Sequence, residues 1–374
     1  MSIETSVIIK TLAKVIDPGS GQDLITMSMV RDLAIEGKKV SFVVEVRKLD
    51  NDKKQQLNFA CIEAIQQVYP DADVHVHMAG QGQQAPPQPG MQQNFGPPNP
   101  LPQVKNVIAI ASGKGGVGKS TVAVNLALAL KATGAKVGLI DADLYGPSIP
   151  TMMGLKGERP KIQDVYGSPK IIPLEAYGIP VISIGFIVEP EQAVVLRGPR
   201  LAGILGQFIN DCIWPELDYL MIDLPPGTGD IQLTLVQSVP VTGAIMVTTP
   251  QEVAVADAIK ALNMFLNPTI NVPILGVVEN MSWFTPEELP NNQYKIFGEG
   301  GGQKLAEFGK TKLLGQVPIV MGVRTGGDNG KPVVMENNNP AAEAFKLIAQ
   351  NVVDQVAWRN KTQDPTEMVK ITTQ

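Results

Sequence analysis

Short apolar runs alternate with segments of helical spacing along the larger, C-terminal part of the chain. The runs, which are rich in Val, Ile, Leu and Ala, are KNVIAIAS, AKVGLIDAD, YLMIDLP, AIMVTTP and PILGVVENM. The segments between them predict helices over residues 119–133, 199–212 and 251–266. Continuous apolar strands that alternate with helices predict an α/β fold with a mostly parallel sheet covered by helices on both faces. Ligands of such folds bind at the carboxyl ends of the strands.

Residues 1–79 show a different pattern, which predicts a small α+β domain. SVIIKTLAKVID has helical spacing, KKVSFVVEVRKL has strand character, and a helix around Cys61 precedes the alternating run DADVHVHM. In that run His75 and His77 share one face of the expected strand. An H-x-H pair can ligate a metal ion, but we expect these histidines to form the solvent face of a half-buried strand.

A segment of unusual composition separates the two patterns. Residues 80–103 consist almost wholly of Gly, Gln, Pro and Asn. They carry too little apolar surface to offset the entropy lost on ordering, so we expect a flexible linker. The larger α/β domain is then expected at 104–358, followed by a C-terminal tail at 359–374.

Composition and charge narrow the classes of function. The chain of 374 residues is 44% apolar and 18% charged, with a formal net charge of −5. An acidic balance disfavours a protein whose main task is to bind nucleic acid. We find neither a signal-peptide pattern nor a run of about 18 apolar residues, so we expect a cytoplasmic protein that does not bind membranes.

The chain has only two cysteines, Cys61 and Cys212, and each falls on an apolar face of a predicted helix. The neighbours on those faces are Leu57, Ile65 and Val68 for the first, and Leu205, Phe208 and Ile209 for the second. We therefore expect both thiols to be small core side chains. A disulfide between them is not expected in a reducing compartment.

The motif with the clearest chemistry lies between the first strand and the first helix of the larger domain. GKGGVGKS fits the pattern G-x-x-x-x-G-K-[ST], whose glycines let backbone N–H groups surround phosphate oxygens at a helix N-terminus. We expect Lys119 to bridge the β- and γ-phosphates, Ser120 to ligate Mg²⁺ and Thr121 to contact the α-phosphate. The expected nucleotide contacts are Gly113, Lys114, Gly115, Gly116, Val117, Gly118, Lys119, Ser120 and Thr121.

Acidic residues follow two other apolar strands, where a phosphoryl-transfer site needs them. Asp141 and Asp143 end one strand, and Asp223 ends another. We expect Asp223 to hold Mg²⁺ through water, Asp141 to support the metal, and Asp143 to orient or deprotonate the attacking water. The alternative is that they are capping or turn aspartates. The Gly- and Pro-rich stretch 225–230 can change conformation when the γ-phosphate is lost.

Lys114 is a second lysine in the loop, directly after its first glycine. Since Lys119 already serves the loop's own nucleotide, Lys114 is free to point outward and reach the γ-phosphate of a neighbouring subunit. There it would neutralise charge in the transition state, as an arginine finger does. This interpretation implies a homodimer, and the alternative is a solvated surface lysine.

The motifs KGGVGKST, DADLYGPSIP and DLPPGTGD together resemble the Mrp/ApbC family of deviant Walker A P-loop ATPases, over about residues 104–355. The resemblance implies a P-loop NTPase fold, ATP as the nucleotide, and a homodimer that carries iron–sulfur clusters to apoproteins. It also implies that Lys114 acts across the dimer and that Asn280, in VVENMS, contacts the adenine. The N-terminal unit is similar to a small domain shared with iron–sulfur assembly factors.

The chain departs from this family directly after Asn280. Family members that hold a cluster carry C-x-x-C there, two cysteines from each subunit. Here the segment reads NMSWFTPEELPNNQYKIFGEGGG, with Pro286, Glu287, Glu288 and Asn291 in that region. A four-cysteine cluster at the family position is therefore excluded, and the cysteine pattern does not support a bound cluster. One could still be held elsewhere, for instance with Cys61, or by a partner, whereas Cys212 is a poor substitute.

These observations favour a homodimeric, Mg²⁺-dependent ATPase that acts in iron–sulfur cluster assembly or transfer, with apoprotein clients or assembly proteins as partners. One alternative is a nucleotide-switched chaperone or regulator without a metal cluster. Another is a positioning ATPase of the Min or Par type, which requires an amphipathic membrane helix or a basic DNA-binding surface. The segment DQVAWRNKTQDPTEMVKITTQ contains a proline and has no such amphipathic face.

Overall fold

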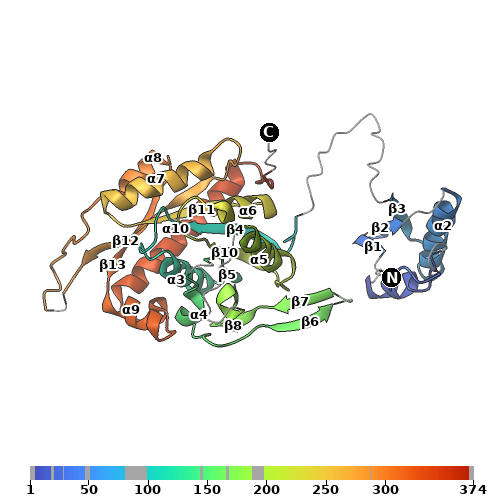
Figure 1. Ribbon diagram of the computed structural model, residues 1–374, viewed down its shortest axis with the longest axis horizontal. Helices are drawn as coiled ribbons and strands as arrows, with labels where there is room; N and C mark the ends of the chain where they lie inside the picture. Colours follow the sequence, from blue (N-terminus) through green and yellow to red (C-terminus); the bar gives the residue numbers. More distant parts are fainter. Residues whose placement is uncertain are drawn as a thin grey trace. The chain divides into compact units, whose positions relative to one another are not determined.

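The computed structural model describes residues 5–17, 21–27, 29–46, 51–80, 99–143, 146–165, 168–187, 198–286 and 288–369. The chain divides into two compact units between Gln93 and Asn94 (Figure 1). Each unit has its own hydrophobic core.

The first unit combines two helices with a three-stranded sheet. Its elements are α1 (Thr5–Leu12), β1 (Val30–Glu36), β2 (Lys39–Val46), α2 (Asn51–Val68) and β3 (Asp73–Gly80). Strand β2 is central, antiparallel to β1 and parallel to β3. The predicted small α+β unit is confirmed. Strand β1 was not predicted, because its sequence VRDLAIE carries charges and lies at the edge of the sheet.

The elements of the second unit, in chain order, are β4 (Val104–Ala111), α3 (Lys119–Ala132), β5 (Val137–Asp141), α4 (Ile149–Met152), β6 (Lys161–Val165), β7 (Ser168–Ile172), β8 (Leu174–Ala176), β9 (Ile179–Ser183), η1 (Ile184–Phe186), α5 (Gly198–Asn210), β10 (Leu217–Asp223), α6 (Asp230–Ser238), β11 (Gly243–Thr248), α7 (Glu252–Leu266), β12 (Ile274–Phe284), α8 (Gly301–Phe308), β13 (Leu313–Ile319), α9 (Met321–Asp328), η2 (Val333–Met335) and α10 (Pro340–Thr362).

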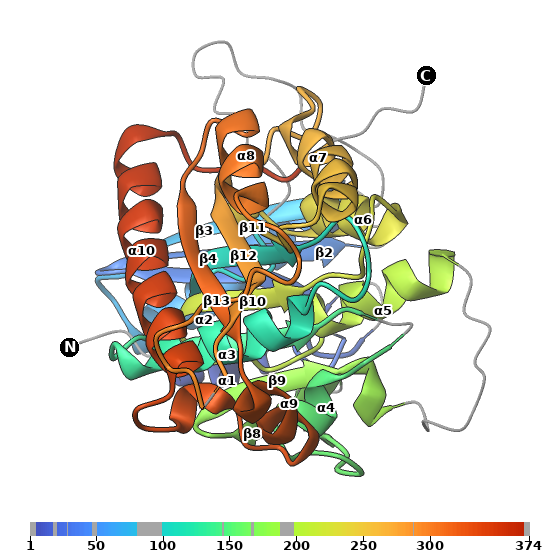
Figure 2. The same ribbon diagram turned by 90° about the vertical axis from the view of Figure 1, so that its left-hand side faces the viewer.

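An eight-stranded sheet in the order β13-β12-β11-β4-β10-β5-β9-β8 forms the centre of this unit. All neighbouring strands are parallel except β8 and β9. Helices flank the sheet (Figures 1 and 2). Strands β5, β10 and β11 are buried almost throughout, which explains their continuous apolar sequences. The predicted α/β architecture is confirmed.

The observed elements differ from the sequence-based boundaries in some places. Helix α5 ends at Asn210, so Cys212 lies beyond it and forms an isolated β-bridge with Ile171. In the first unit Val68, expected on a buried face with Cys61, is 46% exposed, because it is the last residue of α2.

Segments assigned to the linker and the tail pack onto the second unit. Leu101 is buried in its core, and α10 continues past residue 358 to Thr362. Beyond α10, the Val369 N–H donates to the carbonyl of Val236. Within the ranges described above, no helix is both long enough and apolar enough to span a bilayer.

Candidate functional site

The Gly-rich loop joins the end of β4 to the start of α3, with two glycines in the left-handed region. Gly116 has φ +81° and Gly118 has φ +82°. A Cβ on Gly116 would meet open space, whereas a Cβ on Gly118 would lie 2.2 Å from Nδ2 of Asn280. Both positions therefore favour glycine for their backbone conformation, and Gly118 also for the close approach of β12.

Strand β12 and helix α7 pack against this loop and restrict its conformation. Asn280 of β12 is buried, and its Nδ2 donates to the carbonyl of Val117 at 2.9 Å. Gly113 lies against the backbone of Asp257 and Ala258 in α7, too close for any side chain. The shape of the loop is thus set by elements that are distant in the sequence.

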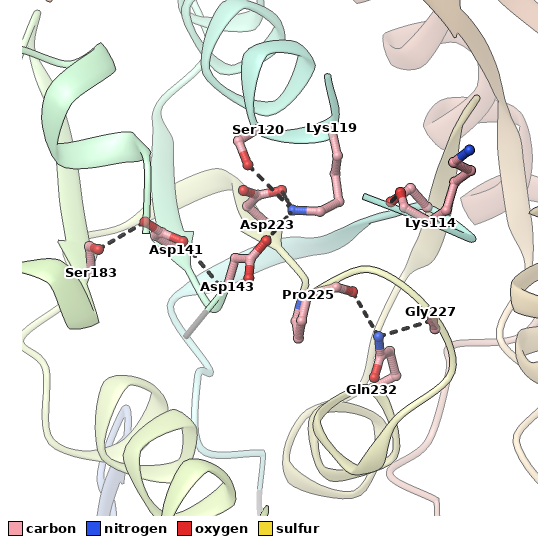
Figure 3. A network of polar contacts seen from close by, with 11 residues as sticks. Lys114, Lys119, Ser120, Asp141, Asp143, Ser183, Asp223, Pro225, Gly227 and Gln232 are labelled. Carbon is pink, nitrogen blue, oxygen red and sulfur yellow. Dashed lines mark hydrogen bonds and ion pairs between the residues drawn. The ribbon is translucent and has the colours of Figure 1, made fainter. Parts of the chain in front are cut away.

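Lys119, the first residue of α3, is the centre of the polar network in Figure 3. Its Nζ donates to Oδ1 of Asp223 at 2.7 Å, and to Oδ2 of Asp143 and Oγ of Ser120 at 3.4 Å each. The lysine side chain is only 6% exposed. The ammonium is therefore held by two carboxylates at the place where the loop would present it to phosphate.

The carboxylates converge because neighbouring parallel strands end in register. Asp223 of β10 is paired with Asp141 of β5, which is paired with Ser183 of β9. Ser183 Oγ donates to Asp141 Oδ2 at 2.9 Å, and the backbone N–H of Asp143 donates to Asp141 Oδ1 at 3.1 Å. Asp141 therefore supports the turn that carries Asp143.

Burial dominates the electrostatics of these groups. It raises the pKa of Asp141 to about 8, together with the neighbouring negative charge of Asp223, while the Ser183 hydrogen bond acts in the opposite direction. Burial also raises the pKa of Asp223, which Lys119 opposes. Oδ2 of Asp223 is buried and has no hydrogen-bond partner among the described residues. An unpaired carboxylate oxygen beside the Ser120 hydroxyl fits a divalent cation and its water shell.

A cavity of about 200 Å³ opens beside this network. It is lined by Ser112, Lys114, Gly115, Gly116, Gly118, Lys119, Ser120, Thr121, Asp143, Ser148, Met152 and Pro226. Most of the loop residues singled out in the sequence thus face one cavity together with Asp143. The residues singled out in the sequence that do not line the cavity are Gly113, Val117, Asp141, Asp223 and Asn280.

Lys114 differs from Lys119 in its orientation. Figure 3 shows its side chain extending away from Lys119 and the aspartates. Among the residues that the structure describes, the Lys114 ammonium makes no ion pair, although Ser112 Oγ donates to its backbone carbonyl at 3.0 Å. An outward, unpaired ammonium is what the cross-subunit hypothesis requires, and the hypothesis itself stays a prediction.

Some residues of the site were not found in the sequence. Ser148 and Met152 line the cavity, Ser183 bonds Asp141 beside it, and Gln232 bonds the loop that follows β10. Ser183 could have been found, since it ends the apolar run GIPVIS as Asp141 ends its own strand. Gln232 has no such signal, because its position resembles any polar residue in the first turn of a helix.

Within the part of the chain that the structure describes, the cysteines and histidines are not gathered into a metal site. Cys61 and Cys212 are 0% and 7% exposed, and burial raises the pKa of both thiols to about 12. His75 and His77 are exposed as predicted, with His75 Nε2 3.1 Å from Asp73 Oδ2. Across the described parts of the chain, no group of three or more His, Cys, Asp or Glu side chains is arranged to hold a metal ion.

The segment after Asn280 returns to α8 through residues 285–300, and Pro286, Glu288 and Asn291 lie in it. Glu287 lies outside the described residues. The chemistry of this segment and the burial of both thiols do not fit an iron–sulfur cluster held by cysteines of this chain.

Comparison with protein families gives two matches. Residues 103–353 match the family described as NUBPL iron-transfer P-loop NTPase, and residues 5–78 match one described as iron-sulfur cluster assembly protein. An iron-sulfur cluster carrier protein of Synechocystis sp. is 44% identical over 95% of this chain and 98% of its own length. Another, from Deinococcus radiodurans, is 40% identical over 96% of this chain and 98% of its own length.

Among solved structures, a nucleotide-binding protein from Archaeoglobus fulgidus in complex with ADP is 37% identical. The two structures align with a TM-score of 0.56, and the alignment covers 66% of this chain and 93% of the Archaeoglobus fulgidus chain. The cell division ATPase MinD of Pyrococcus furiosus is 23% identical with a TM-score of 0.50, covering 67% of this chain and 99% of its own. The predicted P-loop NTPase fold is confirmed by these similarities and by the family match.

Proposed function

The chain belongs to the NUBPL iron-transfer P-loop NTPase family, and from this premise we propose that it hydrolyses ATP in iron–sulfur cluster assembly or transfer. The observation that carries the proposal is the network around Lys119. A buried ammonium beside a left-handed glycine loop, two carboxylates and a hydroxyl has the composition of a phosphoryl-transfer site.

Lys119 would exchange its carboxylate partners for the β- and γ-phosphates, and the loop N–H groups would hold the remaining phosphate oxygens. Ser120 and Asp223 would hold Mg²⁺, Asp223 through water, since its Oδ2 has no other described partner. Asp141 would support the metal through its contacts with Ser183 and Asp143. Mg²⁺ would neutralise the charge that develops on the phosphates.

Asp143 is the group proposed to orient or deprotonate the attacking water. Its side chain lines the cavity and is 15% exposed, so water can reach it, whereas Asp141 and Asp223 are fully buried. We propose that Lys114 neutralises the γ-phosphate of a second subunit in a homodimer. We also keep the proposal that Asn280 contacts the adenine, in addition to its bond with Val117.

The cluster is the cargo of this reaction, and we propose that a partner presents it. The thiols of this chain are buried, and burial raises their pKa to about 12, which disfavours the thiolate form that ligates iron. Assembly proteins and apoprotein clients are the proposed partners, and the unit at 5–78 is the proposed place where they bind. The cytoplasm stays the proposed compartment, because both free thiols suit a reducing environment.

The proposal is tested with purified protein in two assays. The first measures ATP hydrolysis of wild type, Lys114→Ala and Lys119→Ala, with Lys105→Ala as a control at an exposed lysine remote from the loop. We expect Lys114→Ala to bind nucleotide normally but to lose most activity, and Lys119→Ala to lose binding. Full turnover of Lys114→Ala would overturn the cross-subunit role.

The second assay follows cluster transfer from a loaded scaffold protein to an apo-ferredoxin by visible absorbance, with and without ATP. We expect the wild type with ATP to accelerate transfer and Lys119→Ala to have no effect. Transfer that is equally fast without the protein, while ATP hydrolysis is intact, would refute the iron–sulfur role and leave the ATPase assignment standing.

A further inference from the structure

Gln232 is a buried side chain that bonds the loop after β10. It lies in the first turn of α6 and is 1% exposed. Its Nε2 donates to the carbonyl of Pro225 at 2.8 Å and to that of Gly227 at 3.1 Å (Figure 3). One amide group therefore fixes two carbonyls that lie two residues apart in the same loop.

Two prolines limit the backbone hydrogen bonds that this loop can donate. Pro225 and Pro226 have no backbone N–H to donate, and Gly227 adopts φ +93°. The side-chain amide of Gln232 supplies the donors that the prolines lack. Meanwhile Oε1 of Gln232 is buried without a hydrogen-bond partner in the described structure. A buried acceptor without a partner costs free energy, which the two donated hydrogen bonds offset.

The loop is joined directly to the phosphate-binding loop. The N–H of Gly227 donates to the carbonyl of Ser112 at 2.8 Å, and Ser112 Oγ donates to the carbonyl of Lys114 at 3.0 Å. Pro226, between the two bonded carbonyls, lines the nucleotide cavity. A continuous series of hydrogen bonds therefore runs from Gln232 through the loop to Lys114.

We propose that Gln232 is a positioning residue for ATP hydrolysis: its two donated hydrogen bonds hold residues 225–227 and, through Ser112, the backbone of Lys114. The inference rests on the proposed function, since it concerns the same site. Gln232 touches neither Lys119 nor the carboxylates, so losing its donors should disturb turnover while nucleotide binding persists.

The test compares full-length wild type with Gln232→Met and Gln232→Glu. Methionine keeps the length of the side chain without donors, and glutamate keeps the shape but faces the two carbonyls with an acceptor. Gln237→Met and Gln237→Glu are matched controls, because Gln237 is exposed on the same helix. We measure kcat and KM for ATP, the dissociation constant for ADP, and amide hydrogen exchange of peptides covering residues 225–229.

For both Gln232 variants we expect kcat to fall at least tenfold, KM and the ADP dissociation constant to stay within threefold, and exchange at 227–229 to accelerate. The Gln237 variants should behave as wild type. A kcat within twofold of wild type, or a parallel loss of kcat, ADP affinity and global exchange protection, would overturn the proposal. If the wild type hydrolyses no ATP, the proposed function fails. The hydrogen-exchange data then decide whether Gln232 positions the loop, and unchanged exchange at 227–229 in the Gln232 variants would overturn that role.

Discussion

Alanine substitutions at Gly118 and Gly116 separate two causes of destabilisation in the phosphate-binding loop. One is the left-handed backbone, and the other is the contact with Asn280. The two glycines have nearly the same φ, +82° and +81°. An alanine in the left-handed region costs about 1–2 kcal/mol, partly offset by about 0.4–1 kcal/mol from the less flexible unfolded chain. Because both terms apply equally at the two positions, they cancel in the difference between the variants.

What remains in that difference is the contact with Asn280. The new Cβ at 118 would lie 2.2 Å from Nδ2, so Asn280 must move and its hydrogen bond to Val117 must break. Leaving a buried group unpaired costs about 1–3 kcal/mol. We therefore expect Gly118→Ala to lower the free energy of unfolding by about 1–3 kcal/mol more than Gly116→Ala, whose Cβ meets nothing.

Tryptophan fluorescence during urea unfolding is a suitable assay. All three tryptophans, Trp214, Trp283 and Trp358, lie in the second unit, so the signal reports on the unit that contains the loop. Repeating the pair in an Asn280→Ala background should remove the difference, because the obstructing amide is gone. Equal destabilisation by the two alanines in the wild-type background would refute the reasoning.

The remaining predictions concern buried groups. Because burial raises the pKa of the Cys61 and Cys212 thiols to about 12, both should react with a thiol reagent at pH 8 only after unfolding in urea. Their contribution to stability should be full below the usual thiol pKa of about 8.5 and be lost as the pH rises towards 12. Anaerobic reconstitution with iron and sulfide should give no stoichiometric iron, unchanged in Cys61→Ser and Cys212→Ser; iron lost in one variant would contradict this. Ser183→Ala should lower the free energy of unfolding by about 1–3 kcal/mol, because Asp141 loses a buried hydrogen bond, and equal stability in the urea assay would argue against it.

Several features of the protein were determined by the sequence alone, because their physical cause is local. The place of the phosphate-binding loop in the chain is one, since its glycines, lysine and serine all lie within GKGGVGKS, whereas its final shape also depends on β12 and α7. The buried strands are another, because a strand covered on both faces is apolar at every position. The exposed faces of His75 and His77 followed from strict alternation along one strand.

Some strands were not predicted because their sequence pattern is short or polar. Strands β6 and β7 are largely exposed, and β8 has only three residues, so none of them shows a buried run. The edge strand β1 has a neighbour on one side only and carries charged positions.

Tertiary structure alone decided how the site is assembled. Asp223 and Asp143 meet at Lys119 because β10 and β5 are adjacent and in register, and strand order is not encoded in local periodicity. The bond from Asn280 to Val117 joins residues far apart in the chain, and so does the pairing of Ser183 with Asp141. Contacts of this kind depend on which strands lie side by side, and only the packed sheet determines that.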